Sequence, residues 1–160
     1  MEGIRLSEII TPKFWEFHEV FKKSLYTYYV LKGGRSSGKS TTAAIELILE
    51  LVKNPITILC VRKVENTLSG SCYEQLKEAV SMVGMDRYFD FKVSPLKITY
   101  KPRGNSIIFR GADDPAKIKS IKMSKFPITV LWIEELAEFK TEDEVSTIVL
   151  SILRAKLEGE

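Results

Sequence analysis

Eight consecutive residues near the start of the chain combine glycine, serine and lysine at a spacing that can hold a phosphate group. They match the pattern GxxxxGK followed by Ser or Thr in full, as Gly33-Gly34-Arg35-Ser36-Ser37-Gly38-Lys39-Ser40. Glycine at Gly33 and Gly38 allows backbone angles closed to other residues and a close approach of the main chain to a phosphate. The run therefore predicts a phosphate-binding loop.

Each remaining position of the loop has its own predicted role. Successive backbone N–H groups from Gly33 to Thr41 would form a nest for an anion, helped by the N-terminus of a following helix. Lys39 would place its charge on the β- and γ-phosphates, and the Ser40 hydroxyl would be a Mg²⁺ ligand. The alternative is a Gly/Ser-rich turn with an incidental lysine. The four fixed positions occur by chance in under about 1% of chains of this length, which favours the nucleotide interpretation.

Two adjacent carboxylates supply the second chemical element. Glu134 and Glu135 directly follow the apolar run Ile128–Ile133, and a carboxylate at the end of a buried strand can hold Mg²⁺ through its water shell. We assign Glu134 to Mg²⁺ and Glu135 to the general base that polarises the attacking water. The usual metal-side residue is Asp, which is one methylene shorter. The alternative is that the pair only begins the acidic C-terminal region.

Composition limits the class of protein. The chain has 160 residues, of which 44% are hydrophobic and 28% charged, as in one globular domain with a real core. No apolar run approaches the roughly 20 residues that span a bilayer, and no signal peptide is recognisable, so we expect a cytoplasmic protein. Cys60, Cys72 and the single His18 lack the spacing of a metal site, and Cys60 is expected to be a buried apolar residue.

The elements that would position these residues alternate between strands and helices. We expect a strand over 26–31, a buried helix over 39–52, a central parallel strand over 56–61, a helix over 71–83, two strands over 97–100 and 106–110 joined by a turn, a strand over 128–133 and a C-terminal helix. The pairs Ser71 with Glu74 and Thr141 with Glu144 have the spacing of capping boxes. This order predicts an α/β fold with a mostly parallel sheet flanked by helices.

Charge is distributed unevenly, although the net charge is only +3. Between residues 92 and 125 nine basic residues stand against two acidic ones, and from Glu134 onward eight acidic residues stand against three basic ones. The basic stretch around the turn at 101–105 could contact DNA or a neighbouring subunit, and a solvated basic surface is the open alternative.

Taken together, three blocks of sequence resemble the large terminases of bacteriophages, especially the PBSX-type group. The blocks are the segment from Tyr28 to Ser40 with its internal arginine, the segment from Ile107 to Ser120, and the segment from Leu131 to Glu135 with its paired glutamates. They span nearly the whole chain. The resemblance identifies residues 1–160 as the P-loop ATPase domain, of the tandem-acidic type, in the N-terminal part of such a subunit.

The resemblance implies an ATP-driven motor that moves double-stranded viral DNA into a procapsid, with ATP and Mg²⁺ bound. It implies viral DNA, a portal protein and a small terminase subunit as partners, a homo-oligomer when working, no membrane, and a transient location at the procapsid. Arg35 matches an arginine that the family often carries in this loop, where it would stabilise charge or sense the nucleotide alongside the catalytic Lys39 and Glu135. A solvated loop cation is the alternative for Arg35.

The sequence also departs from the family pattern. No glutamine precedes the loop to contact adenine, since Gln75 is the only glutamine. Phe14, Trp15 and Phe17 could stack on a base, with core packing as the alternative. The family's coupling strand, which inserts between the loop strand and the acidic-pair strand, and its nuclease domain are not found within residues 1–160. We therefore expect this chain alone to hydrolyse ATP weakly and not to cut DNA.

Two other functions stay open at this point. One is another P-loop DNA motor, of helicase or recombinase type, although we recognise neither a helicase-type DNA-contact block nor a recombinase-type polymerisation segment. The other is a module that binds a nucleotide without turning it over. Glu135 argues against such a module, because a pure binder needs no carboxylate to activate water.

Overall fold

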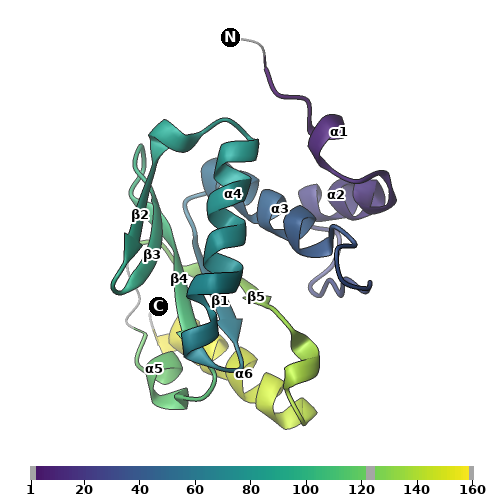
Figure 1. Cartoon of the computed structure of the whole chain (residues 1–160). Helices are drawn as coiled ribbons and strands as arrows, with labels where there is room; N and C mark the ends of the chain where they lie inside the picture. Colours follow the sequence, from purple (N-terminus) through teal and green to yellow (C-terminus); the bar gives the residue numbers. More distant parts are fainter. Residues whose placement is uncertain (1–2, 122–124, 159–160) are drawn as a thin grey trace.

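The computed structural model describes residues 3–121 and 125–158 and places one five-stranded sheet between two layers of helices (Figure 1). The strands lie in the order β2-β3-β4-β1-β5, with the bounds Thr57–Arg62 for β1, Phe89–Val93 for β2, Leu96–Tyr100 for β3, Asn105–Gly111 for β4 and Ile128–Ile133 for β5. Strand β1 pairs in parallel with β4 and β5, whereas β3 is antiparallel to both β2 and β4. Four strands therefore share one direction, which confirms the expected α/β fold with a mostly parallel sheet.

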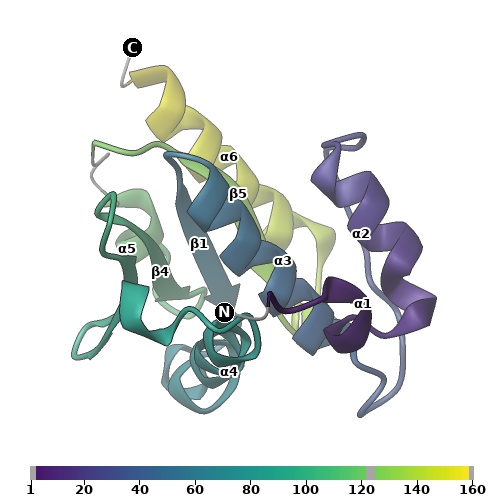
Figure 2. The same cartoon turned by 90° about the horizontal axis from the view of Figure 1, so that it is seen from above.

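The helices cover both faces of this sheet (Figures 1 and 2). The α-helices are α1 Leu6–Ile9, α2 Trp15–Lys22, α3 Lys39–Lys53, α4 Glu74–Met82, α5 Pro115–Lys119 and α6 Glu142–Glu158. Single 3-10 turns lie at Pro12–Phe14, Glu65–Thr67, Asp86–Tyr88 and Leu136–Glu138, and a π-turn spans Ser69–Tyr73. Within the described ranges, no helix has both the length and the apolar composition to cross a bilayer.

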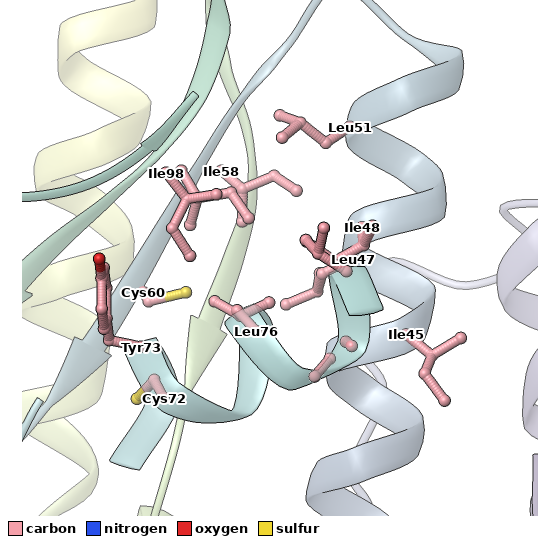
Figure 3. Packing of buried hydrophobic residues seen from close by; sticks show 14 of the residues in the cluster. Ile45, Leu47, Ile48, Leu51, Ile58, Cys60, Cys72, Tyr73, Leu76 and Ile98 are labelled. Carbon is pink, nitrogen blue, oxygen red and sulfur yellow. The ribbon is translucent and has the colours of Figure 1, made fainter. Parts of the chain in front are cut away.

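Strand β1 is buried on both faces, as its unbroken apolar run predicted. Ile58 and Cys60 point into the larger core, which they share with α3 and α4, and Figure 3 shows them opposite Leu76. Leu59 and Val61 point the other way, into a second core with α5 and α6. The end of β1 is therefore held rigidly next to the end of β5.

The predicted hairpin of β3 and β4 is confirmed, with Tyr100 paired to Asn105 across the turn. Strand β2 was not predicted. Among its five residues only Phe89 is buried, and its sequence Phe-Asp-Phe-Lys-Val carries charges and no continuous apolar run. The pairing of β2 with β3 at the margin of the sheet decides its conformation, because edge strands depend more on a neighbour than on propensity.

The predicted strand over 26–31 is wrong: this segment has no regular structure. Within the described residues β5 pairs only with β1, and a largely apolar groove of about 600 Å³ separates Tyr26–Tyr29 from β5 and α6. Aromatic and β-branched residues form a strand only when a neighbouring strand completes their hydrogen bonds. The groove lies where the family resemblance leads us to expect a further strand.

The aromatic residues before the loop pack on one another instead. The ring of Tyr29 lies 5.7 Å from that of Phe17 and 5.3 Å from that of Phe21, and the Tyr29 hydroxyl donates to the Val20 carbonyl at 3.3 Å. Phe14 is buried in the larger core. Phe17 packs on Phe21 and Tyr29 outside the core, and Trp15 is 38% exposed and packs on His18. The alternative of core packing is confirmed for Phe14, and base stacking by Trp15 or Phe17 stays a prediction.

The two predicted capping boxes have different outcomes. The first is wrong: the Ser71 hydroxyl donates to the Thr67 carbonyl at 2.7 Å, and the π-turn at Ser69–Tyr73 precedes α4. The second is half present, because the Glu144 N–H donates to Thr141 Oγ1 at 3.4 Å. The Glu144 carboxylate accepts from Lys63 Nζ at 2.5 Å instead. Among the apolar residues of α6, Val145, Ile148 and Ile152 pack in the second core and Val149 lines the groove. The side chains of Leu153 and Leu157 lie outside the described part.

Two residues of the 101–105 turn close the C-terminal end of α3. Arg103 donates to the carbonyls of Leu51, Val52 and Asn54 at 3.0 to 3.1 Å. Asn105 Nδ2 contacts the carbonyl oxygens of Leu51, Asn54 and Ile56 at 2.9 to 3.1 Å. The final carbonyls of a helix have no partner within it and need outside donors. Arg103 belongs to the basic stretch that was predicted to contact DNA or a neighbouring subunit, or to be a solvated surface. In the structure its side chain caps a helix.

Substitution of Asn105 by alanine is expected to lower the free energy of unfolding by about 1–3 kcal/mol. Asn105 is fully buried, and its loss removes the side-chain donor of the Ile56 carbonyl and one of two donors of the Leu51 and Asn54 carbonyls. Urea unfolding measures this change. The control is Asn66→Ala, since Asn66 is exposed and should cost at most about 0.5 kcal/mol. Equal costs for the two variants would contradict the capping role.

Candidate nucleotide-binding site

The glycine-rich loop leads directly into α3 and is curled by two left-handed residues. Ser36 has a φ of 57° and Gly38 a φ of 82°, a region that residues with a Cβ seldom occupy. A Cβ on Gly38 would also come within 2.9 Å of Thr11 Oγ1. Gly33 does not have a positive φ, and its predicted close approach to a phosphate stays a prediction. The observed constraint at Gly33 is space, because a Cβ there would lie 2.6 Å from Ser37 Oγ.

The start of α3 offers unpaired donors to an anion. Gly38 is the N-cap without a side-chain hydrogen bond, and the first backbone bond of the helix joins the Thr42 N–H to the Gly38 carbonyl at 2.9 Å. The N–H groups before Thr42 have no acceptor in the helix, and the helix dipole favours a negative charge there. Ser37 Oγ is buried without a hydrogen-bond partner in the described part of the chain. These observations fit a phosphate.

Lys39 is folded over the loop that precedes it. Its Nζ donates to the Gly33 carbonyl at 2.9 Å and to the Gly34 carbonyl at 3.4 Å. The ammonium group therefore lies against the first turn of the loop. These neutral carbonyl acceptors can be exchanged for phosphate oxygens, because the negative charge of a phosphate attracts the ammonium group more strongly.

One cleft of about 580 Å³ brings the loop and the acidic pair together. It is lined by Gly33, Lys39 and Ser40 on one side and by Glu134 and Glu135 on the other, with Val30, Leu31, Lys32, Ala43, Trp132, Ile133, Leu136 and Ala137 completing the wall. Five predicted site residues thus meet although about a hundred residues of sequence separate them. Arg35, Gly34, Ser36 and Thr41 are exposed outside this lining, and Ser37 and Gly38 lie half-buried within the loop.

The two carboxylates have opposite environments because the chain turns sharply between them. The Glu134 N–H continues the ladder of β5 by donating to the Val61 carbonyl at 3.1 Å, and its side chain is buried. Glu135 adopts a left-handed conformation with φ 54° and ψ 55° and is exposed. A left-handed residue with a long side chain costs of order 1–3 kcal/mol and is concentrated at functional sites.

Neighbouring side chains hold the acidic turn in place. Arg62, at the end of β1, donates to Glu138 Oε1 at 2.9 Å, which fixes the 3-10 turn that follows Glu135. Cys72 Sγ donates to Glu134 Oε2 at 3.0 Å. Burial, and then the charge of Glu134, raise the pKa of the Cys72 thiol well above its ordinary value, so the thiol stays protonated as a donor. Sequence reasoning missed Cys72, because nothing in its spacing relates it to Glu134.

Comparison with known proteins decides the family. A family model described as "Phage terminase large subunit" matches residues 26–160, which is most of the chain. The chain belongs to the phage terminase large subunit family. This confirms the resemblance drawn from the glycine-rich loop, the segment from Ile107 and the paired glutamates.

Two curated relatives have the same description. The chain is 55% identical to the terminase large subunit of Bacillus phage SPP1 over 157 residues, which cover 98% of this chain and 37% of that protein. It is 35% identical to the PBSX phage terminase large subunit of Bacillus subtilis (strain 168) over 116 residues, or 72% of this chain and 26% of that protein. The chain therefore spans about a third of the length of these relatives or less.

Proposed function

We propose that this terminase chain binds Mg²⁺ and ATP in the cleft between the glycine-rich loop and the end of β5, and that it is the nucleotide-hydrolysing part of a DNA-packaging motor. One observation carries the proposal: Lys39 and Ser40 line the same cleft as Glu134 and Glu135. The P-loop class of ATPases needs that combination of a cation, a hydroxyl and two carboxylates.

The loop would hold the triphosphate. The backbone N–H groups from Gly33 to Thr41 and the Ser37 hydroxyl would surround the phosphates, where the positive end of α3 would add its dipole. Lys39 would exchange the Gly33 and Gly34 carbonyls for oxygens of the β- and γ-phosphates. Ser40 and Glu134 would hold Mg²⁺, whose charge would neutralise that of the phosphate oxygens.

Glu135 would take the proton of the attacking water. Its exposed position at the mouth of the cleft gives it access to solvent, and a positioned carboxylate can act as a general base toward water. Arg35 is exposed at the tip of the loop. From that position the Arg35 side chain would stabilise the charge of the phosphates after a movement of the loop, or would act in the cleft of a neighbouring subunit.

The work of the motor would require partners beyond this cleft. By family, we propose double-stranded viral DNA, a portal protein and a small terminase subunit as partners, within a homo-oligomer that acts at the procapsid. Some basic side chains of the β2–β3–β4 region do not close α3. Of these, Lys92, Lys97 and Lys101 are exposed and are the proposed DNA-facing candidates.

Loss of Lys39 tests the binding proposal. In a titration of purified protein with fluorescent ATP and Mg²⁺, Lys39→Ala is expected to weaken binding by about 10- to 100-fold, the value of one or two charged hydrogen bonds. The control is Lys53→Ala, which removes an exposed lysine at the opposite end of the same helix and should bind as wild type does. Equal affinity for Lys39→Ala and wild type would refute the proposed phosphate site.

A further inference from the structure

A buried thiol holds one of the two carboxylates of the cleft. Cys72 Sγ donates to Glu134 Oε2 at 3.0 Å, and neither residue is more than 6% exposed. Within residues 3–121 and 125–158, Cys72 is the one side chain that donates a hydrogen bond to this carboxylate. Because Glu134 also lines the cleft, the bond to Oε2 leaves Oε1 to meet a ligand there.

A local change of helix type places this thiol. The Tyr73 N–H donates to the Leu68 carbonyl at 3.2 Å, five residues back, which makes Ser69–Tyr73 a π-turn ahead of α4. One extra residue in a helical turn rotates the residues before that turn by about 100° relative to the residues after it. Such π-turns occur often at functional sites. The Ser71 hydroxyl supports the wide turn through the Thr67 carbonyl at 2.7 Å.

The surroundings of the thiol are tightly packed. Cys72 is fully buried, as is Cys60 on β1, and Figure 3 shows the two sulfur atoms on facing elements near Tyr73 and Leu76. Side chains in such a core stay in one rotamer, since few voids allow another. The direction of the hydrogen bond to Glu134 is therefore fixed by the fold and not by the ligand.

The thiol of Cys72 can restrain the position of the Glu134 carboxylate. Glutamate has one more rotatable bond than the aspartate usual at the metal-side position, so its carboxylate can occupy more positions unless something restrains it. A ligand carboxylate gains affinity when a neighbouring donor fixes its orientation in advance. We propose that Cys72 is a positioning residue, whose thiol holds Glu134 in the orientation that binds the Mg²⁺ of the nucleotide. This role rests on the proposed function.

The hydrogen bond itself is testable without a nucleotide. The infrared S–H stretching bands of the two cysteines are assigned with Cys72→Ala and Cys60→Ala. A bond to a carboxylate is stronger than one to a neutral amide, so Glu134→Gln is expected to shift the Cys72 band to higher frequency and to leave the Cys60 band in place. A Cys72 band that does not respond to Glu134→Gln would overturn the proposal.

The role in metal binding has a separate readout. The Mg²⁺ concentration that gives half-maximal binding of fluorescent ATP is expected to rise by about tenfold in Cys72→Ala, the usual cost of losing a partner of a metal ligand. Cys72→Ser keeps a donor and should restore most of the Mg²⁺ response. Cys60→Ala, a matched buried cysteine, should behave as wild type does. Thermal unfolding of each variant separates this effect from loss of fold.

The outcomes distinguish the inference from the function on which it rests. If Cys72→Ala and Cys72→Ser both respond to Mg²⁺ as wild type does, Cys72 has no positioning role although the nucleotide site stands. If wild type binds no nucleotide while the Cys72 band still responds to Glu134→Gln, the proposed function fails and the metal role of Cys72 fails with it, and only the hydrogen bond remains.

Discussion

Single-turnover cleavage of ATP by Glu135→Gln is expected to be about 10²- to 10⁴-fold slower than by wild type, the usual contribution of a general base. Glutamine has the size and shape of glutamate but cannot take up the proton of water. Nucleotide affinity should change little, because Glu135 is exposed at the mouth of the cleft and does not belong to the loop. Rapid-quench measurement with protein in excess over ATP gives the rate even where steady-state turnover is weak.

The backbone at this position adds a second expectation. Glu135 lies in the left-handed region, which glycine enters without cost. Glu135→Gly is therefore expected to raise the free energy of unfolding by about 1 kcal/mol, the relief of strain less the greater entropy of glycine in the unfolded chain. Its single-turnover rate of ATP cleavage should fall as far as that of Glu135→Gln. Stability and activity would then change in opposite directions.

Equal single-turnover rates for wild type and Glu135→Gln would remove the catalytic assignment of Glu135. That result, with nucleotide affinity retained, would favour the alternative of a module that binds ATP without turning it over. Glu142→Gln is the matched control, because Glu142 is an exposed glutamate at the start of α6 and lies outside the cleft.

The second large effect is expected on stability, at the contact between α2 and α3. His18 Nδ1 and Glu46 Oε1 share a hydrogen bond, and both side chains are buried. The His18 ring also packs against Trp15 at 5.0 Å between centroids. Glu46→Ala is expected to lower the free energy of unfolding by about 3–5 kcal/mol, because removal of one member strands the other in the core. Helix α3 follows directly on the glycine-rich loop, so this contact supports the candidate site.

The same pair predicts a dependence on pH. Burial raises the pKa of Glu46 above its ordinary value of 4.5, and the hydrogen bond and charge of His18 oppose that rise. In His18→Ala the opposition is lost, so the pKa of the carboxyl rises further in the folded state. A folded-state pKa above the unfolded one gives stability at low pH that is lost as pH rises. His18→Ala should therefore lose stability as pH increases above about 4.5, over a wider range than wild type.

Urea unfolding of the variants measures both effects. The control is Glu19→Ala, since Glu19 pairs with Lys23 at 3.8 Å on the surface, where such a pair is worth at most about 1 kcal/mol. The double variant His18→Leu with Glu46→Leu should recover much of the lost stability, because an apolar pair leaves no stranded charge. A cost for Glu46→Ala no larger than that for Glu19→Ala would contradict the role of the pair.

Local sequence was sufficient to predict the elements that carry their own signal. Helix α3 and strand β1 are long apolar segments with clear ends, and the loop between Gly33 and Ser40 combines a fixed pattern with a helix that follows it. The acidic pair could be located because a buried strand that ends in two carboxylates is unusual. Each of these features is determined within about fifteen residues of sequence.

The features that sequence reasoning missed depend on contacts between distant residues. Asn105 bonds to carbonyls some 50 residues earlier, and Cys72 reaches Glu134 across 62 residues. Nothing in the sequence relates His18 on α2 to Glu46 on α3, 28 residues later; the packing of the two helices brings them together. The segment over 26–31 has the residues of a strand, yet no strand in the described part of the chain pairs with it. Tertiary partners override propensity in each case.

Binding of Mn²⁺ in place of Mg²⁺, followed by electron paramagnetic resonance, tests most directly whether the loop and the acidic pair form one site. Wild type, Ser40→Ala, Glu134→Gln and the double variant are titrated with Mn²⁺ in the presence of ATP. If both side chains hold the same ion, each single variant loses affinity, and the double variant loses less than the product of the two single effects. Full affinity in Glu134→Gln beside a loss in Ser40→Ala would show that the two elements do not share a metal, and would contradict the proposed site.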